Sequence, residues 1–150
     1  MADLKQKLYE ACARHLHDRI TELTASLRSI QESANEETKS SSGDKYETGR
    51  AMAHLEIEKL QTQLAEANRM KADLTRVPLN DNSSTIKAGS LVFTSRGNFF
   101  IAIHAGEHTL DGTHFFVVSP ASPIAQKMLG LKAGDEFTLN NRAFSIVQTR

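Results

Sequence analysis

The feature that most constrains this chain is a heptad spacing of apolar residues, which occurs twice in its first half. In both runs the positions follow steps of four and three residues, with one lysine in the second run. A stripe this narrow is typical of a helix that packs against a single partner. The first run is Leu16, Ile20, Leu23, Leu27, Ile30 and Ala34, and Leu4, Leu8 and Cys12 extend it toward the start. The second run is Ala53, Ile57, Leu60, Leu64, Ala67, Lys71 and Leu74.

A polar segment, residues 35–43, separates the two runs and ends in three serines and a glycine, which disfavour a helix. Two heptad helices joined by a short polar link predict an antiparallel helical hairpin, or coiled coil, over residues 1–77. Packing or dimerisation is the ordinary purpose of such a seam. Cys12, on the extension of the seam, is interpreted as a small core residue.

The composition changes near Pro78. Residues 1–77 hold 12 of the 18 basic and 13 of the 18 acidic residues, whereas all seven phenylalanines follow Pro78. Pro78 ends the second helix and begins a polar linker, residues 78–85. Short runs at 90–94, 98–104, 113–118, 137–139 and 143–147 predict strands, with turns at Asp111-Gly112 and Asn140-Asn141.

Residues 86–150 therefore predict a small antiparallel sheet domain with one helix, so that the chain as a whole is α+β. Ser122 is the expected cap of that helix, Pro123 its first residue and Gly130 its end. The phenylalanines are interpreted as core residues.

The charges exclude some classes of function. Eighteen basic residues balance eighteen acidic ones, which argues against binding of nucleic acid through net positive charge alone. The longest mostly apolar run, residues 98–105, is far shorter than a membrane helix, so no membrane contact is expected. A single cysteine excludes an internal disulfide framework, and we expect a cytoplasmic protein.

Two carboxylates mark the expected start of the second helix. Asp44 and Glu47 are three residues apart, which places them on one helix face, one turn apart. Two such oxygen donors can share a magnesium ion, although a partner must supply further ligands. Acidic residues in a first helical turn also complement the helix dipole, which explains them without any metal.

The sequence gives weaker evidence for any other kind of site. His15 and His17 are two residues apart and cannot share a helix face, so they do not suggest a metal site. His104, His108 and His114 lack a carboxylate or cysteine at ligand spacing and are interpreted as surface or turn residues. The sequence also lacks a P-loop and a nucleophile elbow, and we expect no stable small-molecule ligand.

Two motifs resemble those of the bacterial transcript-cleavage factors GreA and GreB, and the resemblance covers nearly the whole chain. The first motif is Gly43-Asp44-Lys45-Tyr46-Glu47, similar to the family's hairpin tip. The second is Ser119-Pro120-Ala121-Ser122-Pro123-Ile124-Ala125 with the later Gly130 and Gly134-Asp135-Glu136, similar to the family's Ser-Pro-Ile-Ala helix start and Gly-Asp turn.

The resemblance implies a factor that binds RNA polymerase. An FKBP-like C-terminal domain, residues 86–150, would dock near a coiled coil of the β′ subunit through Ser122, Pro123 and Ile124. The hairpin would enter the secondary channel and reach the RNA 3′ end with its tip, residues 43–47. There Asp44 and Glu47 would help the polymerase hold its second magnesium and cleave backtracked RNA. The factor is then not an enzyme and has no cofactor of its own.

Three alternatives remain. After Glu47 the chain has Thr48-Gly49-Arg50-Ala51 where the family has Asn-Ala-Glu-Tyr, so a channel-binding regulator without cleavage activity is the main alternative. A prolyl isomerase is suggested only by the expected fold of the second domain, and fold does not imply function. A coiled-coil adaptor unrelated to polymerase is the third.

Overall fold

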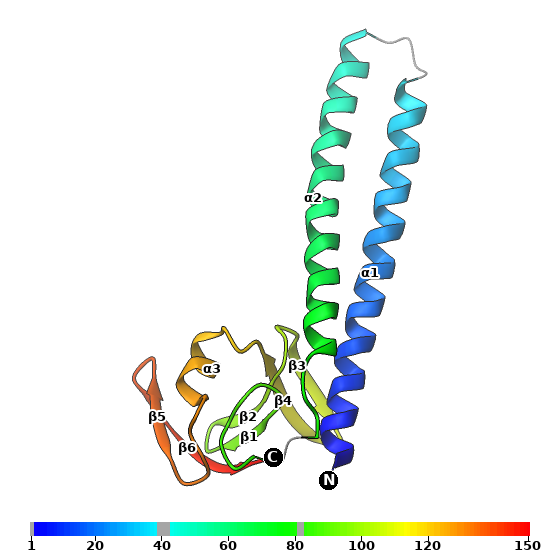
Figure 1. Ribbon diagram of the computed structural model, residues 1–150. Helices are drawn as coiled ribbons and strands as arrows, with labels where there is room; N and C mark the ends of the chain where they lie inside the picture. Colours follow the sequence, from blue (N-terminus) through cyan, green and yellow to red (C-terminus); the bar gives the residue numbers. More distant parts are fainter. Residues whose placement is uncertain (1, 39–42, 81–82) are drawn as a thin grey trace. The chain divides into compact units, whose positions relative to one another are not determined.

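The computed structural model describes residues 2–38, 43–80 and 83–150, and within them the side chains of residues 4–35, 48–80 and 83–150. Two long helices, α1 (Ala2–Thr38) and α2 (Gly43–Thr75), form the hairpin that the heptads predict (Figure 1). Helix α1 continues through residues 35–38, which the sequence assigned to the link. The remainder of that link, residues 39–42, lies outside the described residues.

The two helices pack against each other along the apolar residues that the heptad spacing predicts. Leu23 of α1 and Leu60 and Ala67 of α2 are buried together. Half-buried residues from both runs pack against them, namely Ile20, Leu27, Ile30 and Leu64. The heptads therefore describe the intramolecular packing of this hairpin.

By its contacts the chain divides into two compact units. The hairpin unit is residues 16–71, and the sheet unit is residues 1–15 together with residues 72–150. The first turns of α1 thus group with the C-terminal half of the chain. Leu8, Cys12 and Leu74, which continue the heptad runs, are buried and belong to the sheet unit.

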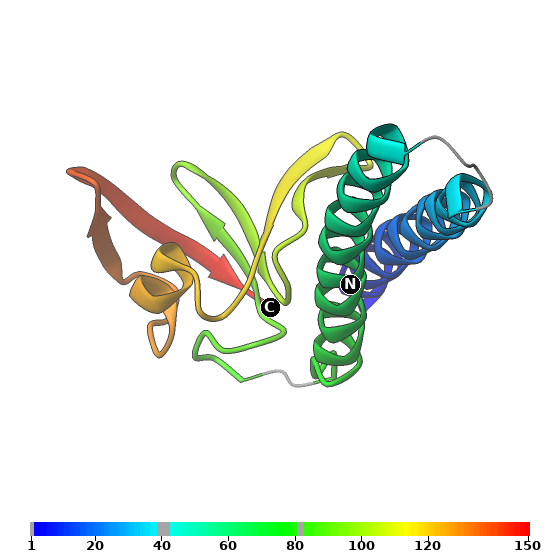
Figure 2. The same ribbon diagram turned by 90° about the horizontal axis from the view of Figure 1, so that it is seen from above.

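The sheet unit contains one six-stranded sheet and a short helix. Its strands follow one another across the sheet in the order β3-β4-β2-β1-β6-β5. Their bounds are β1 (Leu91–Thr94), β2 (Gly97–Ile101), β3 (Gly106–Leu110), β4 (Thr113–Val118), β5 (Glu136–Leu139) and β6 (Arg142–Thr149). The helix, α3 (Pro123–Met128), lies beside the β5–β6 hairpin in both views (Figures 1 and 2).

The α+β class and the order of hairpin, sheet and single helix are confirmed, but the sheet is not wholly antiparallel. Strands β2 and β4 pair in parallel, with Asn98 opposite Phe115 and Ile101 opposite Val118. The reason is the position of β3, which lies at the sheet edge and pairs with β4 alone. The chain passes through this edge strand before β4 returns alongside β2, so the sheet is mixed.

Five of the seven phenylalanines are buried and two are half-buried, as expected for core residues. A main cluster joins the inner sides of β1, β2, β5 and β6 to one side of α3. Its buried members are Ile86, Val92, Phe99, Ile101, Ala125, Met128, Phe137, Phe144 and Ile146. These positions alternate along each strand, but β1, β2 and β4 also bury the intervening residues Leu91, Phe100, Phe115 and Val117, so both faces of this part of the sheet are covered.

The two predicted hairpin turns have the backbone that their residues favour. Asp111 and Gly112 have φ of 51° and 79°, and Asn140 and Asn141 have φ of 53° and 64°. Consecutive positive φ values define the type I′ turn, whose twist matches that of paired strands. The first turn joins β3 to β4 and the second joins β5 to β6.

Candidate functional site

The predicted tip residues fall at the start of α2. Asp44 and Glu47 are the second and fifth residues of that helix, so its backbone brings both positions to one side. Their side chains lie outside the part of the structure that is described. Whether the two carboxylates converge on one ion therefore stays a prediction.

Ser122 caps α3, as the sequence predicts. Its backbone is extended, with φ −65° and ψ 151°, and its Oγ accepts a hydrogen bond of 3.3 Å from the Ala125 backbone N–H. The same hydroxyl donates to the Ser119 carbonyl oxygen over 2.7 Å. The Ser122 side chain therefore both holds the loop before α3 and caps the N-terminus of the helix.

The other two predicted docking residues differ in exposure. Pro123 is the first residue of α3 and is exposed, whereas Ile124 is half-buried and packs against the main core cluster. The Gln126 amide donates to the Pro120 carbonyl oxygen over 2.7 Å, which ties the loop to the helix from the other side. This loop is thus held by its own hydrogen bonds and presents Pro123 to solvent.

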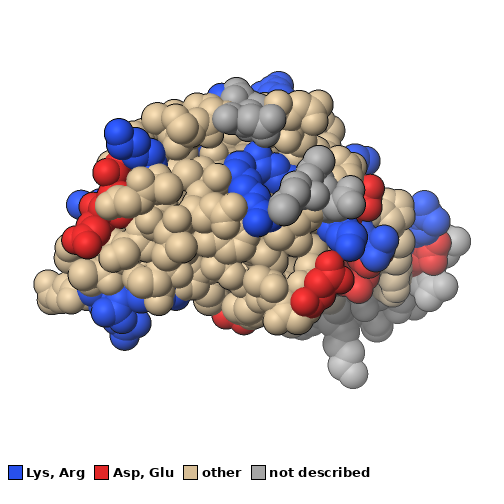
Figure 3. All heavy atoms as spheres, turned by 90° about the horizontal axis from the view of Figure 1, so that it is seen from below, with Lys and Arg blue, Asp and Glu red and all other residues tan. Residues whose placement is uncertain are grey.

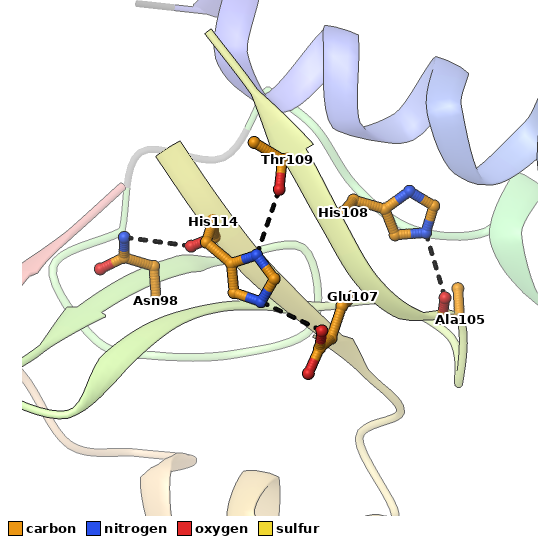
Figure 4. Close-up of polar contacts among 6 residues, drawn as sticks. All are labelled: Asn98, Ala105, Glu107, His108, Thr109 and His114. Carbon is orange, nitrogen blue, oxygen red and sulfur yellow. Dashed lines mark hydrogen bonds and ion pairs between the residues drawn. The ribbon is translucent and has the colours of Figure 1, made fainter. Parts of the chain in front are cut away.

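A polar cluster on β3 and β4 was not predicted. His114 lies opposite Thr109 in the ladder, and its Nδ1 is 3.2 Å from the threonine hydroxyl (Figure 4). Its Nε2 is 3.4 Å from a carboxylate oxygen of Glu107, and its ring meets that of Phe116 edge-on. The Asp111-Gly112 turn fixes this register, so it was the signal that could have brought Glu107 and His114 together.

These contacts are exposed and best understood as cross-strand stabilisation. The side chains of His114 and Glu107 keep about half or more of their exposure, so water screens the ion pair. Such a pair contributes little to stability and resembles ordinary sheet-surface pairing. Expectation and structure therefore agree that His114 is a surface residue, although it does have a carboxylate neighbour.

The first turns of α1 meet the other side of β3 within the sheet unit. The Lys7 ammonium is 3.2 Å from the Asp111 carboxylate, and the rings of His15 and His108 meet edge-on at 6.0 Å. The His108 Nε2 also lies 3.0 Å from the Ala105 carbonyl oxygen (Figure 4). These contacts explain why the start of α1 groups with the sheet.

Two ionisable side chains of α1 are buried. Lys5 is only 6% exposed, and burial, together with the positive charge of Lys87, lowers its pKa. Cys12 is fully buried, and burial raises the pKa of its thiol to about 11. A thiol with so high a pKa is a poor nucleophile, which confirms the interpretation of Cys12 as a core residue.

The described residues contain no group of three or more His, Cys, Asp or Glu side chains that could hold a metal ion. No helix in the described ranges is long and apolar enough to cross a membrane. On the face shown in Figure 3, lysine and arginine side chains form separate groups with uncharged residues between them.

Comparison with known proteins adds one structural similarity. No protein-family model and no curated protein matches the chain. Among solved structures, the chain is similar to one described as the structure of the transcription factor Gfh1. The two are 20% identical, the alignment covers 93% of each chain, and the TM-score is 0.38. At that score the similarity carries no argument about function.

Proposed function

We propose that this chain binds the secondary channel of RNA polymerase and stimulates the polymerase's own cleavage of backtracked RNA. The observation that carries the proposal is the position of Gly43-Asp44-Lys45-Tyr46-Glu47, which falls at the start of α2. The start of α2 belongs to the end of the hairpin that is far in sequence from the sheet strands. In the cleavage factors that the chain resembles, the tip motif lies at this end.

The chemistry of the tip suits a shared magnesium ion. Carboxylates are ligands that magnesium prefers, and the ion usually keeps several waters and takes only one or two protein carboxylates. When bound, a second metal ion activates water and stabilises the leaving oxygen in phosphodiester hydrolysis. Asp44 and Glu47 would hold and orient that ion, while the polymerase supplies the remaining ligands. The chain therefore needs no cofactor of its own.

The second motif supports a docking role for the loop before α3. Pro123 is exposed beside the N-cap residue Ser122, and two hydrogen bonds hold the loop against α3. A rigid, exposed loop loses little conformational entropy on binding. We propose that Ser122, Pro123 and Ile124 contact the β′ subunit, with Ile124 acting mainly through its packing against the core.

The test is RNA cleavage in halted, backtracked polymerase complexes. Asp44→Asn and Glu47→Gln keep the shape of each side chain but remove its charge, so we expect each to lower the saturating cleavage rate by about 100-fold or more. Glu58→Gln is the control, because Glu58 is an exposed acid of the same helix that pairs with His54. Equal cleavage by the two tip variants and the parent would refute the mechanism.

The alternative is a channel-binding regulator that does not promote cleavage. It differs from the first proposal in one result. The parent protein would bind polymerase and compete for the channel, yet would release no RNA fragment at any concentration of factor or magnesium.

A further inference from the structure

The first turns of α1 lie along the edge strand β3 in a register that two contacts fix. Lys7 pairs with Asp111 at one end, and the ring of His15 meets that of His108 at the other. Residues 7 and 15 are about 12 Å apart along the helix, and residues 108 and 111 are about 10 Å apart along the extended chain. These similar lengths mean that the helix runs beside the strand, so the two histidines are brought together by their elements.

One ring nitrogen of His108 is hydrogen-bonded, and the other keeps its lone pair. The His108 Nε2 lies 3.0 Å from the Ala105 carbonyl oxygen (Figure 4). Because a carbonyl oxygen can only accept, Nε2 donates and carries the hydrogen. In the neutral ring Nδ1 is then an acceptor, and Figure 4 shows it on the ring edge away from Ala105. A histidine that binds metal through one nitrogen usually donates its other N–H to such a carbonyl or carboxylate.

The His15 ring is available for a second bond to a metal ion. It is exposed and makes no hydrogen bond or ion pair with any residue that the structure describes. Its contact with His108 is edge-on, with an interplanar angle of 88°. The lone pair of a neutral imidazole lies at the ring edge, so edge-on packing suits coordination better than a stack does. The χ2 torsion of histidine is soft, which lets an exposed ring adjust.

The separation of the two rings fits a shared metal ion. A zinc–nitrogen bond is about 2 Å long, so the centre of each coordinating ring lies about 3 Å from the ion. At a tetrahedral or wider angle, the centroids of two such rings are about 5–6 Å apart. The centroids of His15 and His108 are 6.0 Å apart. Aromatic pairs without metal occur at the same separation, so the two available nitrogens are what favours a metal site.

We propose that His15 and His108 bind one divalent transition-metal ion of the zinc, nickel and copper group, which fastens α1 to β3. Imidazole nitrogen suits these ions, whereas magnesium prefers oxygen ligands. Water fills the remaining positions, as it does in zinc sites that keep an open position. The inference does not depend on the proposed function, because both histidines belong to the sheet unit and not to the hairpin tip.

Calorimetric titration of the whole chain with zinc chloride tests the site. We expect one bound ion per chain, and His15→Gln and His108→Gln should each lower the zinc affinity by about tenfold or more, because a single imidazole remains. His17→Gln is the matched control, since His17 is an exposed histidine two residues along the same helix. Free zinc at about 100 times its dissociation constant should raise the unfolding temperature of the parent by about 5 °C or more, and magnesium should not.

Nickel provides a second measurement that needs no variant. This paramagnetic ion should broaden the NMR signals of the His15 and His108 rings together, at a lower concentration than those of His17 and His114. Broadening that spreads equally over all four rings would overturn the site. So would a His15→Gln variant that binds zinc as tightly as the parent. Because His15 is exposed, its substitution leaves the core intact, and circular dichroism of the variant separates loss of the ligand from loss of the fold.

Discussion

Gly89 joins the segment after the hairpin to the first strands, and its conformation leaves no room for a side chain. Its φ is +92°, and a Cβ built on it would lie 2.1 Å from the Pro78 carbonyl oxygen. Its backbone N–H donates to the Ile101 carbonyl oxygen over 2.7 Å. The residue therefore combines a left-handed backbone with a close backbone approach, and each alone favours glycine.

We expect Gly89→Ala to lower the free energy of unfolding by at least about 3 kcal/mol, because the backbone at Pro78 must move. Gly112→Ala separates the two causes. Gly112 also has a positive φ, +79°, but a Cβ there meets nothing within 4 Å. Its cost should be the backbone term alone, about 1–2 kcal/mol. Urea unfolding followed by circular dichroism measures both, and equal costs would contradict the steric explanation.

Cys12 makes stability depend on alkaline pH. Because burial raises the pKa of its thiol to about 11, the folded state disfavours the thiolate that the unfolded chain forms near pH 9. The contribution of the neutral thiol is thus complete below about pH 9 and is lost as pH rises toward 11. The expected loss is up to about 3 kcal/mol.

The measurement is the difference in unfolding free energy between the parent and Cys12→Ala across pH 8 to 11. The alanine variant lacks the titration, whereas both proteins share Lys5. The lowered pKa of Lys5 acts in the opposite direction, since its buried charge destabilises the fold until the pH rises above that pKa. A difference that stays constant with pH would show that the thiol is not buried in solution.

Among the elements, α3 depends most on its surroundings. It has six residues, too few for a stable isolated helix, and it is held by the Ser122 cap and by the burial of Ala125 and Met128. Its end is also fixed, because the Gly130 backbone N–H donates to the Ile86 carbonyl oxygen over 2.9 Å. A substitution at the cap is therefore expected to affect the whole loop that presents Pro123.

Ser122→Ala should lower the free energy of unfolding by about 1 kcal/mol through loss of the cap. Ser122→Asn can keep the cap, since asparagine is an equally good N-cap residue. Urea unfolding of both variants tests this, and their affinity for polymerase separates folding from contact. If asparagine restores stability but not binding, Ser122 touches the partner directly. If it restores both, the serine acts through the helix.

The elements also show what local sequence can predict. The heptads specified the seam, and Asp111-Gly112 and Asn140-Asn141 specified two hairpins, because each signal acts between residues close in the chain. Strand β3 itself was missed, although the turn that follows it was predicted, because its residues are mostly glycine and polar and give no alternation of apolar with polar residues. The parallel pairing of β2 with β4 was missed because it depends on where β3 lies, which no local signal reports.

Across the whole molecule, some parts of the candidate site could be predicted from the sequence and others could not, for a physical reason. Ser122 and Pro123 act within one turn of α3, so their roles in the helix follow from residue type and order. The contact of His114 with Glu107 crosses two strands and needed the register of the sheet. The roles of Asp44 and Glu47 require a partner that supplies the other metal ligands, and no property of this chain alone contains that information.

The division of the sheet unit into residues 1–15 and residues 72–150 has a consequence for synthesis of the protein. Residues 1–15 leave the ribosome well before the rest of their unit, which is completed only when β6, which ends at Thr149, has emerged. At 5–20 residues per second the interval is on the order of 10 s. During this interval the later part of the sheet unit is not yet present to bury Leu8 and Cys12. The Cys12 thiol is therefore most accessible to an oxidant on the nascent chain.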